Sequence, residues 1–429
     1  MATVQGNAGG GAGQHDDAGP FTLTSISSYR QSKNRGPGAS GSVFRADPLI
    51  LQVANPSGPG DLELLTQEFR VTSPGNQTLE YTLGAFGSHQ VQHLGSSSVS
   101  VSLAPAPGVV IPVANTVGTP SRILDDSLAA FGQGTLHLGP AFRLIGGGRI
   151  TSEKLELTGR SSFSLTKLSY RFGAQYDLAA NTMVYATVSH GYKGGQIAID
   201  NLGNPYTLRP EIPQDYEAGL KTTLFGGWVA DLNVFYDTVN NYQAQSCITT
   251  ANGSINCFSA NIDGVRTRGG ELNLFGRVAQ GLTVNTGFIY AKATYPKGYV
   301  GTDGSVIGGT QLAYAPEKKF TFSGEYEHPV TDRVKGFFAA DTVWKSRIRY
   351  EANSVGQSTF RPHWLVGGRV GVRTDDDRFQ LAVFARNLFN VHEPVLLQSS
   401  FPYSGGANVG AIYSPQSFRQ LGISLDGKF

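Results

Sequence analysis

The chain has 429 residues, of which only 15% are charged, and it contains 55 glycines, 18 tyrosines and 24 phenylalanines. Its formal net charge of +2 gives no reason to expect nucleic acid or an acidic partner. The mean hydropathy is −0.17, and no apolar run approaches the roughly 20 residues of a membrane helix. Near-neutral hydropathy with so few charges is typical of a membrane β-barrel, because half of every barrel strand is polar.

Residues 1–20 are predicted to form an irregular segment. The chain starts without the basic and apolar stretches of a signal peptide. The segment Gln5–Gln14 is so rich in glycine that it resembles the inside of a long loop. If the protein is exported to a membrane, the chain is therefore expected to be incomplete at its N-terminus.

The rest of the chain, 21–429, is predicted to consist of about sixteen strands in which apolar and polar residues alternate. In one of them, Leu232 and Tyr236 would face lipid, whereas Asn233 would face the lumen. The predicted strands are 21–31, 61–73, 78–91, 122–136, 141–153, 166–178, 181–193, 214–225, 228–242, 264–277, 281–294, 316–328, 333–347, 361–373, 378–390 and 416–429.

The connections between these strands are short and long by turns. Short ones, such as Pro74–Asn76 and Thr374–Asp377, contain residues that favour tight turns. A strict alternation of this kind is what an up-and-down membrane barrel requires, with turns at the periplasmic end and loops outside. We therefore predict an all-β fold, a transmembrane antiparallel β-barrel. The long connections are predicted near 32–60, 92–121, 154–165, 194–213, 243–263, 295–315, 348–360 and 391–415.

The last strand has a clear two-faced pattern. Leu421, Ile423, Leu425 and Phe429 fall on one face, and the residues between them are polar or glycine. An outer face in lipid and an aromatic ring at the interface would explain this pattern. A C-terminal phenylalanine is also typical of proteins inserted into the bacterial outer membrane, so Phe429 is predicted to be the signal read by the outer-membrane assembly machinery.

Seven segments, in this order along the chain, resemble successive strands of TonB-dependent outer-membrane receptors. The resemblance begins near residue 20 and covers nearly all of the chain. It implies a family barrel of 22 strands, filled by an N-terminal plug and coupled to TonB through a short N-terminal box, of which the chain contains only the last sixteen strands or so. The matching segments are Leu23–Arg30, Gln67–Ser73, Tyr81–Phe86, Val184–Gly195, Asp215–Lys221, Gly264–Leu272 and Ala385–Asn390.

A partial barrel would have two strand edges in lipid, and each unpaired main-chain group there costs several kcal/mol. Two outcomes are open. Either the strand at 21–31 closes onto the strand at 416–429 to form a narrower barrel of porin size, or the fragment does not persist alone.

Cys247 and Cys257 lie in a long loop that would be extracellular and oxidising. A disulfide is therefore the favoured interpretation, with two free thiols or half of a metal site as alternatives. The histidines are scattered and no metal site is expected. Glu325 and Glu327 would be solvated lumen carboxylates rather than a general acid–base pair. We find no nucleophile–base motif, so neither an enzyme nor a cofactor is expected.

Aromatic residues in or near loops and arginines of the lumen or rim are candidate ligand contacts. Each tyrosine has an alternative role in the aromatic girdle at the membrane interface. An arginine could hold an anionic ligand such as a ferric chelate. The candidates are Tyr206, Tyr299, Tyr314, Tyr350, Tyr403, Arg268 and Arg386.

The resemblance implies outer-membrane transport of a scarce nutrient, most often a ferric siderophore, although haem, cobalamin and glycans are also carried in the family. TonB would act only through the missing N-terminal region, and a monomer is expected. The alternatives are a passive porin-like channel of about sixteen strands and a non-functional receptor fragment.

Overall fold

The computed structural model describes residues 9–18, 21–34, 38–46, 49–57, 60–95, 98–106, 109–117, 120–199, 204–249, 255–301, 304–354, 356–399 and 409–428. Strands dominate these residues, together with three short 3-10 turns, η1 (Phe225–Gly227), η2 (Gly356–Ser358) and η3 (Pro415–Ser417). Within the same ranges, no helix is long and apolar enough to span a membrane.

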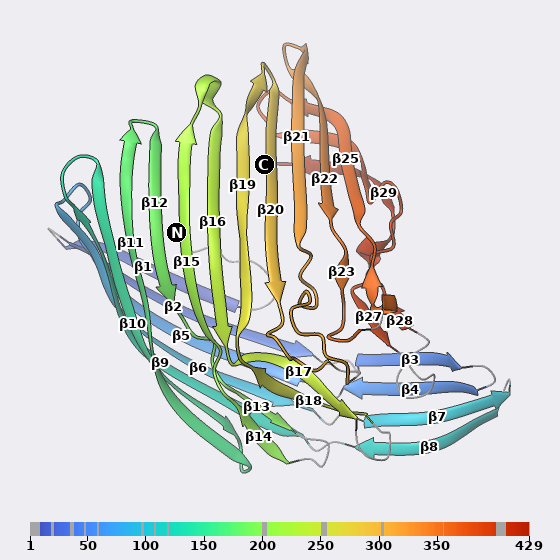
Figure 1. The fold of residues 1–429 in the computed structure, drawn as a ribbon. Coiled ribbons are helices and arrows are strands. Elements are labelled where there is room, and N and C mark those ends of the chain that lie inside the picture. The colour runs from blue at the N-terminus through green and yellow to red at the C-terminus, as the bar shows by residue number, and fades with distance from the viewer. Residues whose placement is uncertain are drawn as a thin grey trace.

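One curved antiparallel sheet of seventeen strands forms the body of the protein (Figure 1). Each strand of this sheet pairs with the strand of the same sheet that follows it in sequence, so the sheet is a simple meander. The strands in between, such as β3 (Gly38–Ala46) and β4 (Leu49–Ser57), belong to the connections of the sheet. Its strands are β1 (Gly9–Ala18), β2 (Phe21–Asn34), β5 (Gly60–Thr72), β6 (Leu79–Leu94), β9 (Ser121–His137), β10 (Phe142–Leu157), β11 (Ser161–Ala179), β12 (Thr182–His190), β15 (Ile212–Thr223), β16 (Val229–Asn240), β19 (Val265–Ala279), β20 (Leu282–Thr294), β21 (Lys318–Thr331), β22 (Val334–Lys345), β25 (His363–Thr374), β26 (Phe379–Arg386) and β29 (Gln420–Gly427).

All sixteen predicted strands are present, and β1 is an additional one. Residues 1–20 were predicted to be irregular, but Gly9–Ala18 pairs along its whole length with β2. A glycine-rich segment has no alternation of apolar and polar side chains, so the sequence pattern did not indicate this strand. Its main-chain N–H and C=O groups nevertheless pair with those at the edge of β2. Of the two outcomes left open by the sequence, closure of strand 21–31 onto 416–429 is not seen. Within the described residues, no pairing joins β29 to β1 or β2, and the sheet is open.

The long connections lie together at one end of the sheet, shown at the bottom of Figure 1, and the tight turns lie at the other. Most of the long connections form strands of their own, because an extended chain satisfies its main-chain groups by pairing with itself. The predicted loop at 154–165 is instead continuous strand with a turn at 158–160. These additional strands are β3 (Gly38–Ala46), β4 (Leu49–Ser57), β7 (Ser98–Ala106) and β8 (Val109–Val117) in one small sheet, and the hairpins β13 (Gln196–Ile199) with β14 (Pro205–Leu208), β17 (Tyr242–Thr249) with β18 (Ile255–Ile262), β23 (Ile348–Arg349) with β24 (Thr359–Phe360), and β27 (Leu396–Ser399) with β28 (Val409–Ile412).

Large apolar side chains cover one face of the main sheet and are open to the surroundings. On β29, Leu421, Ile423 and Leu425 are 69%, 73% and 76% exposed. Leu232 and Tyr236 on β16 are also exposed, as predicted. A soluble protein rarely presents so continuous an apolar face, and we refer to it below as the outward face. The opposite face, which we call the inward face, carries most of the polar and charged side chains.

The hydrophobic core of the described residues lies at the loop end rather than inside the sheet. Its members come from the loop-end residues of β19 and β20, from β18, from the connection 295–317 and from the segment after β23. A membrane barrel encloses a polar interior, so apolar packing is available only where loops cover one another. The cluster comprises Ile262, Val265, Ala293, Tyr295, Ile307, Leu312 and Ala352.

The tight turns show why particular residues occupy them. Gly281, between β19 and β20, has a φ of 78°. A Cβ at this position would lie 2.2 Å from the carbonyl oxygen of Glu327 on the neighbouring strand. Only glycine permits both the left-handed conformation and this close approach.

The two faces of β19 predict effects of different size when an arginine is introduced. Leu272 is on the outward face and Asn273, the next residue, is exposed on the inward face. Leu272→Arg should lower the free energy of unfolding by about 2–4 kcal/mol, because a charge near the bilayer midplane is costly. The control Asn273→Arg adds the same charge to the polar face and should change it by less than about 1 kcal/mol. Denaturant titration of the protein in phospholipid vesicles measures both, and equal effects would contradict the assignment of the two faces.

Candidate functional site

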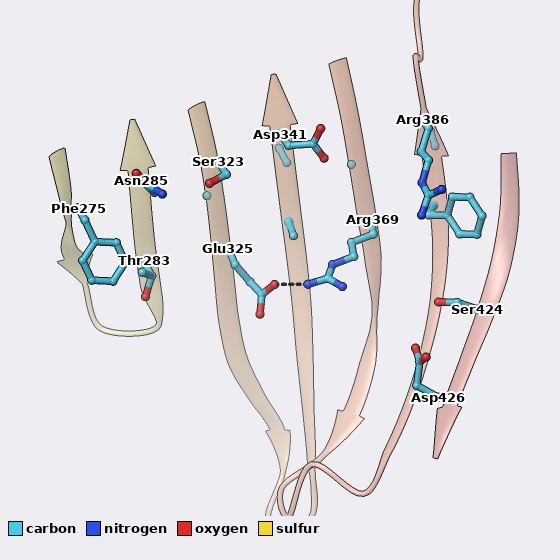
Figure 2. Close-up of a pocket in the computed structure, with 16 residues that line it drawn as sticks. Phe275, Thr283, Asn285, Ser323, Glu325, Asp341, Arg369, Arg386, Ser424 and Asp426 are labelled. Carbon is cyan, nitrogen blue, oxygen red and sulfur yellow. Dashed lines mark hydrogen bonds and ion pairs between the residues drawn. The ribbon is translucent and has the colours of Figure 1, made fainter. Parts of the chain in front are cut away.

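The inward face contains a recess of about 700 Å³ that spans β19 to β29. Figure 2 shows its side chains projecting from the same side of the neighbouring strands. Because residues two apart on a strand share a face, the strand register alone brings these side chains together. The polar lining comprises Thr283, Asn285, Ser323, Glu325, Asp341, Arg369, Arg386, Ser424 and Asp426.

A group of ion pairs forms one wall of this recess. Glu325 accepts from Arg369 Nη2 at 2.7 Å and from Arg373 Nη2 at 2.5 Å. The other terminal nitrogen of Arg373 lies 2.9 Å from Glu327 Oε1. In the register, Ala339 separates Glu325 from Arg369, and its small side chain lets the arginine reach across a whole strand (Figure 2).

The ion-pair group rests on an aromatic ring. Phe337 on β22 is only 3% exposed, and the guanidinium carbons of Arg373 and Arg369 lie 4.4 Å and 5.5 Å from its ring centre. Charge-assisted hydrogen bonds and cation–π contact both orient a guanidinium. This wall is therefore held in place, which makes it a structural part of the recess.

Arg386 is the cation of the recess that is left available. Its guanidinium carbon lies 5.4 Å from the ring centre of Phe384. Within the described part of the chain it makes no ion pair, and its side chain is exposed. An exposed guanidinium stacked on one ring keeps its donors free for a carboxylate or another anion.

A second cavity, of about 510 Å³, lies at the loop end of the sheet. Tyr314, Tyr350 and Lys319 line it together with Lys345 and Glu393. Tyr350 is 4% exposed and its hydroxyl donates to the Pro394 carbonyl oxygen at 2.7 Å. Burial, followed by the nearby Glu393 carboxylate, raises the pKa of the Tyr350 hydroxyl, so it stays a donor.

Tyr314 lines the same cavity. It is 53% exposed, and its ring meets that of Tyr350 edge-on with 5.2 Å between centres. Its main chain has a φ of 60°, a conformation that a bulky residue adopts at some energetic cost. An exposed aromatic ring held in a strained conformation beside a cavity is a reasonable ligand platform.

Glu393 ties the loop 391–395 to the end of the sheet. Its carboxylate accepts from Lys345 Nζ at 2.8 Å, and it lies 3.0 Å from His363 Nε2. Burial raises the pKa of Glu393, but the hydrogen bonds from His363 and Lys345 together outweigh it, and the net pKa is lowered. The charged form of Glu393 therefore stabilises this part of the loop end.

The predicted contact residues do not form a single site. Tyr314 and Tyr350 share the loop cavity and Arg386 lines the inward recess. Three others lie apart from both. Tyr206 donates its hydroxyl to the Ser259 carbonyl oxygen at 2.9 Å, so it joins two loop hairpins. Tyr299 stacks on Tyr295 with 4.7 Å between ring centres. Arg268 projects from the outward face, beside Tyr236 in the register.

Some of the predicted residues cannot be placed. Tyr403 and Phe429 lie outside the described residues. Cys247 and Cys257 are directly opposite one another in the β17–β18 hairpin, but their side chains lie outside what the structure describes. The disulfide therefore stays a prediction.

Sequence reasoning missed the pairing of Arg369 and Arg373 with Glu325 and the junction of Glu393 with Lys345. Both depend on which residues face one another across strands, and alternation alone does not reveal this. Metal binding has no support in the described ranges, where no three His, Cys, Asp or Glu side chains are arranged to hold an ion.

A meandering sheet with an apolar outward face, a polar inward face, tight turns at one end and folded loops at the other is the wall of a transmembrane β-barrel. The model of the family "TonB dependent receptor-like, beta-barrel" matches residues 3–388, and the chain belongs to this family. This is a family of receptors rather than of enzymes.

Solved structures of similar fold include two bacterial receptors and the protein FpvA. The ferric yersiniabactin uptake receptor FyuA from Yersinia pestis has a TM-score of 0.73 at 16% identity, covering 97% of this chain and 60% of FyuA. The siderophore receptor PiuA from Acinetobacter baumannii has a TM-score of 0.70 at 15% identity, covering 97% and 63%. FpvA of P. aeruginosa, solved with pyoverdines, has a TM-score of 0.67 at 16% identity, covering 96% and 54%. At such identities the likeness shows the fold alone, and the chain spans less than two thirds of each of these proteins.

The junction at Glu393 predicts a pH dependence of the loop end. Because the pKa of Glu393 is lowered by folding, its contribution is complete near neutral pH and is lost as the pH falls below about 4. Glu393→Gln should remove this dependence and, at pH 7, reduce the local opening free energy of residues 391–395 by on the order of 1–3 kcal/mol. Hydrogen exchange, corrected for intrinsic rates, measures the effect. Asp332→Asn, in an exposed turn at the other end, is the control, and an equal change in it would contradict the assignment.

Proposed function

We propose that the chain forms the barrel wall of a receptor in the outer membrane of a Gram-negative bacterium, where it binds a ferric siderophore and admits it in a TonB-dependent manner. The observation that supports this most directly is the combination of family membership with an inward recess lying below a folded loop end. The loop cavity would meet the ligand first, and the recess would lie on its way inward.

The chemistry of the two cavities suits a ferric chelate. Such a ligand presents oxygen donors, is commonly anionic and often carries aromatic rings. Tyr314 and Lys319 provide an aromatic face and a cation in the loop cavity. Arg386 provides an unpaired guanidinium beside an aromatic ring in the recess. The aromatic rings in the two cavities would contact the rings of the chelate, and the cations would bind its anionic oxygens.

The partners follow from the same proposal. The outward face would contact membrane lipid, and the assembly machinery would recognise the C-terminal strand through Phe429. TonB would act through an N-terminal region beyond this chain, and the receptor would be monomeric. The segment 1–20 and the barrel portion 21–429 would then be parts of one longer protein.

The first test is to recover the protein from outer membranes of its source and to measure its intact mass and its uptake of radioactive iron. A product much heavier than 45.7 kDa that takes up a ferric siderophore only in the presence of TonB would support the proposal. A product of this mass with steady ion conductance in planar bilayers would instead support a passive channel. Absence of any product would support a non-functional fragment.

Arg386 provides a residue-level test of ligand recognition. Arg386→Gln should weaken binding of a ferric siderophore by about tenfold, because a hydrogen bond to a charged group contributes on the order of 1.5–3 kcal/mol. Arg386→Lys should recover part of the loss. Arg333→Gln, in an exposed turn at the opposite end of the sheet, is the matched control. Titration of the ferric siderophore against protein fluorescence measures the affinities, and equal affinities for all variants would rule out Arg386 as a ligand contact.

A further inference from the structure

Near the loop end, the outward side chains of neighbouring strands change in the same order, from apolar to aromatic to basic. On β20, Phe288, Tyr290 and Lys292 follow one another at every second position toward the loops. On β21, Phe320 is followed by Lys318 in the same direction. An apolar stretch, then an aromatic ring, then a cation is the order in which a strand leaves hydrocarbon and enters the headgroup region.

Four cations meet at this level on three adjacent strands. Arg268 is directly opposite Tyr236 on one side and Lys292 on the other. Arg266 lies one outward position further toward the loops, and Lys318 is opposite Tyr290. Outward neighbours on paired strands lie about 4.5–5.5 Å apart at Cβ. We call this group of four residues, Arg266, Arg268, Lys292 and Lys318, the basic rim.

The height of the basic rim matches the edge of the membrane. Val278, at the register shift near the tight-turn end of β19, is 51% exposed. Ten residues separate it from Arg268, or about 33 Å of strand, and a tilt of about 40° reduces this to about 25 Å across the membrane. An outward apolar band is about 25 Å tall, so Arg268 lies at its upper boundary.

Aromatic residues on the next strands mark the same level independently. Trp344 and Trp364 face each other in the register of β22 and β25 with 6.3 Å between ring centres. Phe320 meets Trp364 edge-on at 5.9 Å. Tryptophan gathers at membrane interfaces because its ring is apolar and its N–H is polar.

The charges of the basic rim are not neutralised by the protein. Within the described residues, none of the four side chains makes an ion pair or hydrogen bond. Along β16, β19, β20, β21 and β22, the outward positions include no aspartate or glutamate. Elsewhere on the outward face, some titratable side chains do have partners: His89 Nδ1 lies 2.5 Å from Asp126 Oδ1, and Lys154 Nζ lies 3.3 Å from Glu156 Oε2.

We propose that the basic rim binds the phosphate groups of a phosphorylated lipid headgroup in the external leaflet. Cations at the edge of an apolar band, with no protein counter-charge, attract the anionic groups of the membrane surface. Arginine and lysine are the side chains that bind phosphate oxygens through charge-assisted hydrogen bonds. The proposal rests on the outward face lying in lipid, and it does not depend on which nutrient is carried.

The test measures binding of diphosphoryl lipid A to the full protein in a neutral detergent, by native mass spectrometry. The variant Arg266→Gln, Arg268→Gln, Lys292→Gln, Lys318→Gln should bind at least about tenfold more weakly, given a loss of about fivefold for each charge near an anionic surface. The matched control removes four charges at the tight-turn end, through Arg277→Gln, Arg333→Gln, Arg378→Gln and Lys428→Gln, and should bind normally. Exchanging lysine and arginine within the basic rim should preserve binding.

The unmodified protein provides a comparison that does not depend on folding of the variants. It should prefer diphosphoryl lipid A over the same lipid without phosphates, and rising salt should weaken that preference. Equal binding of both lipids, or undiminished binding by the four-glutamine variant of the basic rim, would overturn the proposal. Complete displacement of the lipid by millimolar inorganic phosphate would also overturn it, because the basic rim would then be a site for soluble anions. Since the assay contains no siderophore, failure here would leave the proposed transport function standing.

Discussion

The requirement that main-chain N–H and C=O groups be hydrogen-bonded in hydrocarbon governs this structure. No water is available there to satisfy an unpaired group, so a spanning strand must pair with neighbours along its whole length. The seventeen-stranded meander meets this demand with the most local connections possible, since each strand pairs with the next. Local pairing also explains why the turns at one end are tight and why a residue such as Gly281 is needed in them.

The same constraint determines where apolar and charged groups lie. With lipid outside, the apolar side chains face outward, and the interior is polar instead of forming a hydrophobic core. Buried apolar packing therefore moves to the loop end, where Tyr295, Ile307 and Leu312 pack together. Charged groups on the inward face are organised by pairing, as with Glu325 and its two arginines, because a partly enclosed charge requires a partner.

Loop packing and inward charge have different roles in the proposed receptor. The buried Tyr350 and the junction at Glu393 give the loop end a defined shape, so that a cavity persists there. In the recess, the pairing of Arg369 and Arg373 leaves Arg386 as the available cation. A rigid wall and an unpaired cation together make a more selective surface than a uniformly solvated lumen, because part of the charge is already committed to the protein.

Alternation along the strands was sufficient to predict the sixteen strands, the two faces and the separation of turns from loops, because period-two patterns report directly on lipid and water. The strand β1 was not predictable in this way, since its glycines carry no pattern. The structure separates the candidate contact residues from one another. Tyr314, Tyr350 and Arg386 line cavities, whereas Tyr206 and Tyr299 hold loops together and Arg268 faces outward.

The sequence by itself thus determined the class of fold, since each strand must match its own surroundings residue by residue. Only the tertiary structure decided that the sheet is open, that Arg369 reaches Glu325 past Ala339, and that Arg268 stands with Lys292 rather than in the lumen. The physical reason is that a strand's pattern records its own two faces, whereas a site depends on register between strands. A shift of one residue would move every side chain to the other face.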